Sequence, residues 1–198
     1  MTASRMLTAA GLAFVFVLGA CSSSETIADA GATARIYGPA QNVGNGTVRT
    51  YVVLDKKDPN TPLEIGVAMS EAAMDNLPTA VPSNDPMANM HMYTLVLPAQ
   101  NPTPYKFVQF DWNPAGHEPA GVYDLPHFDF HFYTVPVATR DGILPTDPQY
   151  AAKAARYPDS TLRAPFYIDA ATPAGIPASA AAVPQMGLHW LDVRSPEL

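Results

Sequence analysis

The 198-residue sequence has a single cysteine, Cys21, so no disulfide can form within the chain. Positive charge is also scarce, because 11 Lys and Arg stand against 18 Asp and Glu, which gives a formal net charge of −7. A chain of this kind has no basic patch with which to release counterions from phosphates. We therefore predict that nucleic acid is not a partner.

Sequence motifs for nucleotide binding and for serine hydrolysis are missing as well. The chain contains neither GxGxxG nor GxxxxGK(S/T), whose glycines let the backbone cradle phosphates, and it has no GxSxG nucleophile elbow. Ser, His and Asp all occur, but without such a context they do not indicate a catalytic triad. No catalytic residue is assigned from the sequence.

The N-terminus has the pattern of a secretory leader. Arg5 precedes the apolar run LAFVFV at residues 12–17, and LGAC follows at residues 18–21. This segment is too short to span a membrane as a helix. LGAC resembles the lipobox of bacterial lipoproteins, in which cleavage leaves the cysteine as a lipid-bearing N-terminus. We predict a lipoprotein signal peptide at residues 1–20 and lipidation of Cys21; an ordinary secretory signal with an incidental cysteine is the alternative.

The residues after the cysteine indicate a location and a tether. Ser22, rather than Asp, resembles the pattern that sends bacterial lipoproteins to the outer membrane. We therefore predict a cell-envelope protein that contacts the membrane through lipidated Cys21 and faces the periplasm or the exterior. Residues 21–45 begin with few large apolar side chains and are predicted to form a flexible tether. The folded domain is predicted at residues 46–198.

The rest of the sequence predicts strands more than helices. With 47% hydrophobic residues the chain can bury a core, and its 21 prolines and 12 glycines are spread as turn signals. The predicted strands are residues 47–54, 63–69, 91–97, 105–112, 126–133, 164–168 and 186–193. Short helices are predicted after Ser70 and at residues 147–155. The expected fold is mainly β: an antiparallel sandwich or barrel-like domain with one or two short helices.

One predicted strand, PHFDFHFY at residues 126–133, alternates polar and aromatic residues. Successive side chains of a strand face opposite ways, so the aromatic residues are expected to pack into a core. These aromatic residues are Phe128, Phe130 and Phe132. The polar residues His127, Asp129 and His131 then form a row on the opposite face.

The polar row suggests a metal site built from several segments. His127 and His131 lie about 13 Å apart along a strand, whereas Zn–N bonds are about 2.0–2.1 Å, so they do not share an ion unless the strand bends. Further ligands are expected from the GHEP turn and the late MGLHW segment. The predicted ligand set is His117, Glu118, His127, Asp129, His131 and His189. Asp129 either ligates or orients an imidazole, and the set suits Zn, Mn, Fe, Ni or Cu.

Three functions fit this face. The first is a binding protein for a divalent metal or an unidentified small polar ligand, with no activity established. The second is a metal-dependent enzyme of the hydrolase type that uses the same face, and the third is a structural lipoprotein whose histidines satisfy one another. A weaker pattern, PMANMHMY at residues 86–93, gathers soft ligands for Cu(I) but is better explained by core packing beside a loop.

Four runs carry a family resemblance: DWNPAGHEPAGVYDLPHFDFHFY, GTVRTYVVLD, IGVAMSEAAMDNLP and VPQMGLHWLDVRSPEL. Together they resemble the TTHB210-like family of bacterial proteins, a domain of unknown function. The resemblance implies a mainly β fold and a ring-like homo-oligomer, and it supplies no established activity. It also implies that the family sequence continues beyond SPEL into strands with a glutamate-containing motif. A closing strand and one site residue are therefore expected to be missing from these 198 residues.

Overall fold

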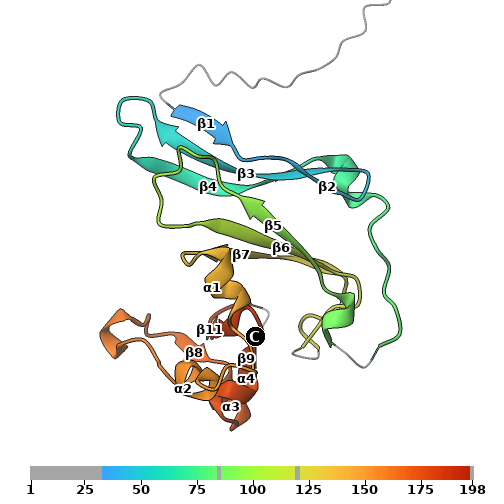
Figure 1. The fold of residues 1–198 in the computed structure, drawn as a ribbon, viewed down its shortest axis with the longest axis vertical. Coiled ribbons are helices and arrows are strands. Elements are labelled where there is room, and N and C mark those ends of the chain that lie inside the picture. Colours follow the sequence, from blue (N-terminus) through green and yellow to red (C-terminus); the bar gives the residue numbers. More distant parts are fainter. Residues whose placement is uncertain (1–32, 84–85, 119–120, 197–198) are drawn as a thin grey trace, which may run out of the picture. The chain divides into compact units, whose positions relative to one another are not determined.

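Two antiparallel sheets make up most of the fold (Figure 1). The computed structural model describes residues 33–83, 86–118 and 121–196. The predicted signal peptide, residues 1–20, and the predicted lipidation site, Cys21, lie outside these ranges.

The first sheet is built around the long strand β3 (Gly46–Asp55). On one side β3 pairs with β4 (Pro62–Met69), and on the other it pairs with β1 (Thr33–Tyr37) and β2 (Gln41–Val43). The β-branched residues of β3 alternate between its two faces, so one face supplies buried side chains to the core.

Strands β1 and β2 occupy residues that the sequence analysis assigned to the tether, so the prediction that the fold begins at Gly46 is wrong. Ile36 of β1 packs against the core, and the Arg49 guanidinium lies 3.8 Å from the centre of the Tyr37 ring. The segment of β1 becomes a strand because its partners lie on β3, more than ten residues further along the chain, whereas β2 forms a tight hairpin with the start of β3.

The second sheet is the meander β5 (His91–Val96), β6 (Phe107–Asn113) and β7 (His127–Tyr133). Its central strand, β6, is buried on both faces from Phe107 to Asp111. One face packs against the first sheet. The other face carries polar side chains that are also buried.

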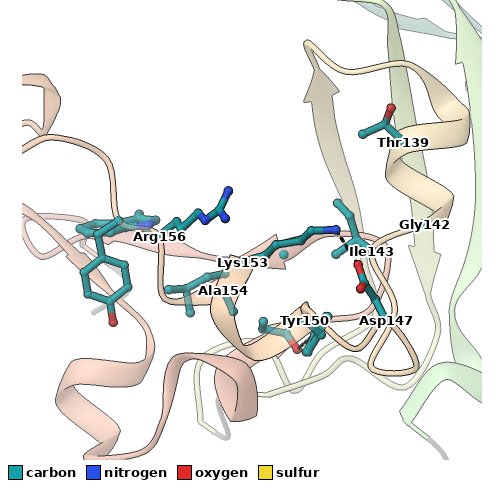
Figure 2. A pocket seen from close by; sticks show the side chains of 13 residues that line it. Thr139, Gly142, Ile143, Asp147, Tyr150, Lys153, Ala154 and Arg156 are labelled. Atoms are coloured by element: carbon teal, nitrogen blue, oxygen red, sulfur yellow. Dashed lines mark hydrogen bonds and ion pairs between the residues drawn. The ribbon is translucent and has the colours of Figure 1, made fainter.

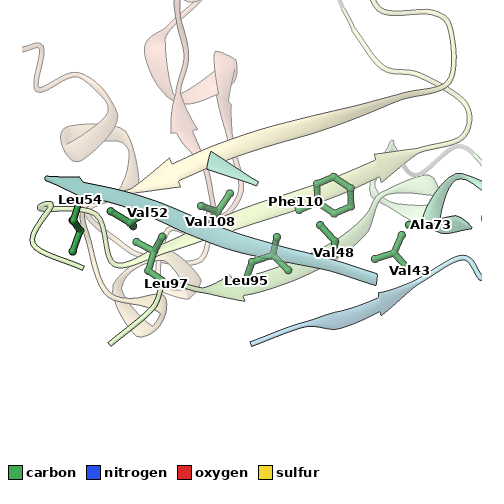
Figure 3. Packing of buried hydrophobic residues seen from close by; sticks show 9 residues of the cluster. All are labelled: Val43, Val48, Val52, Leu54, Ala73, Leu95, Leu97, Val108 and Phe110. Carbon is green, nitrogen blue, oxygen red and sulfur yellow. The ribbon is translucent and has the colours of Figure 1, made fainter. Parts of the chain in front are cut away.

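Both sheets belong to one unit, residues 31–198, and share one hydrophobic core (Figure 3). The buried members of this core are Val43, Val48, Val52, Leu54, Ala73, Leu95, Leu97, Val108 and Phe110. Because two antiparallel sheets contribute to a single core, the predicted mainly β, sandwich-like fold is confirmed.

The aromatic row of β7 follows the prediction at two of three positions. Phe128 and Phe132 are partly buried against the core, whereas the side chain of Phe130 is 49% exposed. The expectation that Phe130 is a core residue is therefore wrong. Strand β7 pairs only with β6 among the described strands, so side chains on this edge strand are covered incompletely.

The helices are short and more numerous than predicted. The described residues contain four α-helices: α1 (Val137–Asp141), α2 (Tyr150–Ala154), α3 (Ala171–Ala174) and α4 (Ala178–Ala181). Single 3-10 turns occur as η1 (Glu71–Met74), η2 (Pro86–Asn89) and η3 (Ser160–Leu162). Among these residues no helix is long and apolar enough to cross a membrane.

The two predicted helices correspond to η1 and α2. The first is reduced to one 3-10 turn because the Ser70 hydroxyl accepts a hydrogen bond from the Thr47 backbone N–H at 3.0 Å instead of capping the helix. The second begins at Tyr150, three residues later than expected.

Two small antiparallel strand pairs complete the C-terminal part. Strand β8 (Tyr167–Asp169) pairs with β11 (Trp190–Asp192), and β9 (Ala182–Val183) pairs with β10 (Gly187–Leu188). The predicted strand at residues 186–193 is therefore split in two. His189 stands at the break, and its carbonyl oxygen accepts a hydrogen bond from the Ala170 N–H at 3.0 Å.

Candidate metal centre

The face of β6 and β7 that points away from the core is lined with polar side chains. The polar cross-strand pairs on this face are Asn113 with His127, Asp111 with Asp129, and Gln109 with His131, and the aromatic pair Phe107 with Tyr133 lies at the end of the row. The predicted polar row of β7 therefore faces a second polar row on β6. Directly opposed residues have Cβ atoms about 4.5–5.5 Å apart, so the two rows can share ligands or hydrogen bonds.

His117, from the loop between β6 and β7, completes a compact cluster with His127 and Asp129. The Nε2 atoms of the two histidines are 3.1 Å apart. The His117 Nε2 lies 3.0 Å from Asp129 Oδ2, and the His127 Nε2 lies 3.6 Å from Asp129 Oδ1. Two ligands bound at about 2.0–2.1 Å with tetrahedral angles are about 3.3 Å apart. The three donor atoms thus already have the spacing of ligands around one ion.

Hydrogen bonds on the far side of both rings decide where the imidazole protons are. The Nδ1 of His117 lies 2.7 Å from the Glu118 carbonyl oxygen, and the Nδ1 of His127 lies 2.7 Å from the Leu125 carbonyl oxygen. A carbonyl oxygen only accepts, so each Nδ1 donates and each neutral ring carries a lone pair at Nε2. Two lone pairs and a carboxylate face one another, and this arrangement requires a cation or a proton between them.

Supporting contacts hold the carboxylate and the loop. Asn113, which is buried, donates from Nδ2 to Asp129 Oδ2 at 2.9 Å, as outer-shell partners of metal ligands do. The loop turns at Gly116, whose φ of +66° is in the left-handed region. The His117 backbone N–H then donates to the Tyr123 carbonyl oxygen at 2.9 Å. This bond fixes the backbone position from which the His117 side chain extends.

The remaining predicted ligands lie elsewhere. The backbone carbonyl of Glu118 accepts the hydrogen bond from His117 Nδ1, but the exposed Glu118 side chain is not part of the three-residue cluster. His131 faces the buried carboxylate of Asp111, with 3.4 Å between His131 Nδ1 and Asp111 Oδ2. The ring of His189 lies 6.1 Å from that of His131. Burial lowers the pKa of His189, and the neighbouring His131 lowers it further.

The sequence analysis missed the residues of β6 that face this site. Gln109, Asp111 and Asn113 alternate with apolar residues in FVQFDWN, which is the same pattern as in the strand that was singled out. The signal was therefore present. Arg140 of α1 was also missed, although it is buried and its Nη1 donates to the Gln109 side-chain oxygen.

A cavity of about 430 Å³ lies in the C-terminal part (Figure 2). It is lined by residues of α1, α2 and the late strands, and none of the three clustered residues lines it. Its Lys153 ammonium donates to Asp147 Oδ2 at 2.6 Å, so this positive charge is already paired. The cavity and the candidate metal centre are separate features.

Fold and site together define a sandwich-like β domain with a histidine–aspartate cluster on the outer face of one sheet. Residues 60–112 match the TTHB210-like family model, described as "Hypothetical protein TTHB210". The predicted resemblance is confirmed over this range, which runs from before β4 to the penultimate residue of β6. The match includes Asp111 and ends before His117. Comparisons with curated proteins and with solved structures each found no match.

Proposed function

We propose that this protein binds a divalent metal ion through His117, His127 and Asp129. The observation that carries the proposal is the meeting of two imidazole lone pairs and a carboxylate within 3.0–3.6 Å. A metal ion neutralises the carboxylate and accepts both lone pairs at once. Imidazole and carboxylate ligands without a thiolate suit Zn, Mn, Fe, Ni or Cu(II).

A hydrolase is the second candidate, because the cluster has the composition of a catalytic metal site. Structural zinc sites are closed by four protein ligands, whereas catalytic sites have three and leave a position for water. Here the cluster contributes three donors, and the side chains of His117 and Asp129 are 31% and 28% exposed. A bound water at such a position supplies a nucleophile.

Titration calorimetry of the purified full chain, after removal of metal by a chelator, tests the proposal. Zn, Mn, Ni and Cu are titrated in turn, and at least one is expected to bind and to raise the melting temperature. Asp129→Asn removes the anionic ligand at nearly constant shape and is expected to abolish the binding of an ion at this three-residue cluster. If none of the four metals binds, the proposal is refuted and the structural interpretation, in which the histidines satisfy one another, takes its place.

Gly116→Ala is expected to weaken metal binding by about 10–100-fold, the range seen when the support of a ligand is lost. An added Cβ would lie 2.2 Å from the Tyr123 carbonyl oxygen, which is the acceptor that fixes the His117 backbone. Gly121→Ala is the matched control, since Gly121 in the same loop also has a positive φ but has open space around it. Equal affinities of the two variants would show that this turn does not position His117.

For the location we propose anchorage in the bacterial envelope through lipid on Cys21, supported by the LGAC sequence alone. Cys21→Ser is expected to move the protein from the membrane fraction to the soluble fraction, or to leave the leader uncleaved. Immunoblots of fractionated cells measure both outcomes. Equal recovery of wild type and variant in the membrane fraction, with equal processing, would contradict the anchor.

A further inference from the structure

Next to the three-residue cluster, the carboxylate of Asp111 stands in an unusual environment. Asp111 is fully buried and lies directly opposite Asp129 in the cross-strand register. Two like charges in opposed positions destabilise a sheet. Burial makes the cost larger, because a carboxylate away from water needs a partner of opposite charge.

The hydrogen bonds of Asp111 do not supply that charge. Its Oδ2 accepts from the neutral amide of Gln109 at 2.8 Å, and its Oδ1 has no hydrogen-bond partner in the described part of the chain. Arg140 is near, but its guanidinium bonds to the Gln109 side chain and forms an ion pair with Asp141 at 2.8 Å. The arginine therefore orients the amide toward Asp111 and does not contact the carboxylate itself.

His131 is the other partner that faces Asp111. Its Nδ1 is buried, lies 3.4 Å from Asp111 Oδ2, and makes no hydrogen bond within the described residues. A protonated imidazole would approach a carboxylate to about 2.7–2.9 Å. The observed separation is longer, and it matches the roughly 3.3 Å between two ligands of one tetrahedral ion.

We infer that Asp111 and His131 hold a second divalent cation beside the one bound by His117, His127 and Asp129. The inference rests on the proposed function, since it adds a position to the same polar face. It explains why two carboxylates are opposed, because a cation on each side compensates both charges. It also gives a partner to the buried Nδ1 of His131. His189 is the nearest further imidazole, with its ring 6.1 Å from that of His131.

A pair of cations also bears on the hydrolase alternative. Two-metal sites occur in phosphatases, nucleases and aminopeptidases, where the two ions stabilise the attacking and the leaving oxygen. The opposed carboxylates Asp111 and Asp129 place the two positions next to each other across β6 and β7.

The stoichiometry of metal binding tests the inference. The full chain, stripped with a chelator and titrated with Zn, is expected to bind two ions, and elemental analysis after desalting measures the same ratio. Asp111→Asn and His131→Gln are each expected to bind one ion, with the other retained. Melting curves show that the variants are folded; if Asp111→Asn does not fold, His131→Gln decides.

Other outcomes separate this inference from the proposed function. One ion in the wild type, retained in both variants, would overturn the second position and leave the first. Loss of every ion in a folded variant would mean a single shared site and would also overturn it. No ion in the wild type would overturn both proposals. When both positions are loaded with Mn, the electron paramagnetic resonance spectrum of the wild type is expected to show coupling between two neighbouring Mn ions. The Asp111→Asn variant is expected to lack this coupling.

Discussion

Phe110→Ala is expected to lower the free energy of unfolding by about 3–5 kcal/mol, the usual cost of removing a buried phenylalanine ring. Phe110 is fully buried in the central strand of the second sheet. Its ring stacks on Phe128 with 4.8 Å between centroids and meets Tyr93 at 6.0 Å. Truncation therefore leaves a cavity in the core that both sheets share. Denaturant titration of the full chain measures the loss.

Phe130→Ala is the matched control for this prediction. Phe130 belongs to the same aromatic group and contacts Phe110 at 5.2 Å, but its side chain is 49% exposed. Much of the Phe130 ring therefore stays in contact with water in the folded protein. Truncation of Phe130 is expected to lower the free energy of unfolding clearly less than truncation of Phe110. Equal losses in the two variants would show that the edge of β7 is covered in solution.

His127→Ala is expected to weaken metal binding by more than about 100-fold, because loss of a ligand costs more than loss of a supporting contact. The variant removes one of the two lone pairs that meet at 3.1 Å. Asn113→Ala, which removes only the hydrogen bond to Asp129, is expected to cost about 10–100-fold. Calorimetric titration with the metal that binds most tightly gives both affinities.

His91→Ala is the control for the histidine series. His91 lies on β5 opposite Trp112, and therefore on the face of the sheet that points toward the core. Its replacement is expected to leave the metal affinity unchanged. Loss of affinity in His91→Ala, with His127→Ala unaffected, would place the site elsewhere and favour the methionine-rich segment around residue 91.

The sequence predicted the strands that carry their own signal. Strands β3, β4, β5 and β7 appear within about one residue of their expected bounds, because alternation with period two and flanking turns are local features. Strands β1 and β2 were missed because they lack a continuous apolar row. Strand β1 becomes a strand by pairing with a distant part of β3, which no local pattern encodes. Strand β2 pairs with β3 across the two-residue turn Gly44-Asn45, a local hairpin signal that the sequence analysis did not use.

The burial of polar groups also depends on contacts between residues that are distant in the sequence. Gln109 and Arg140 are 31 residues apart, yet the guanidinium of one bonds to the amide of the other. From the sequence, a charged residue in a five-residue helix is expected to be exposed. Arg140 is buried only because α1 packs against β6. The exposure of Phe130 is likewise set by the sheet edge and not by its neighbours in sequence.

By itself, the sequence determined that His127, Asp129 and His131 share a face, because alternation in a strand depends only on the backbone. It could not determine which of them act together. The tertiary structure joins His117 to His127 and Asp129, because the turn at Gly116 brings the loop back over the end of β7. It leaves His131 with Asp111, because strand rise separates His131 from His127 and cross-strand pairing supplies a different carboxylate.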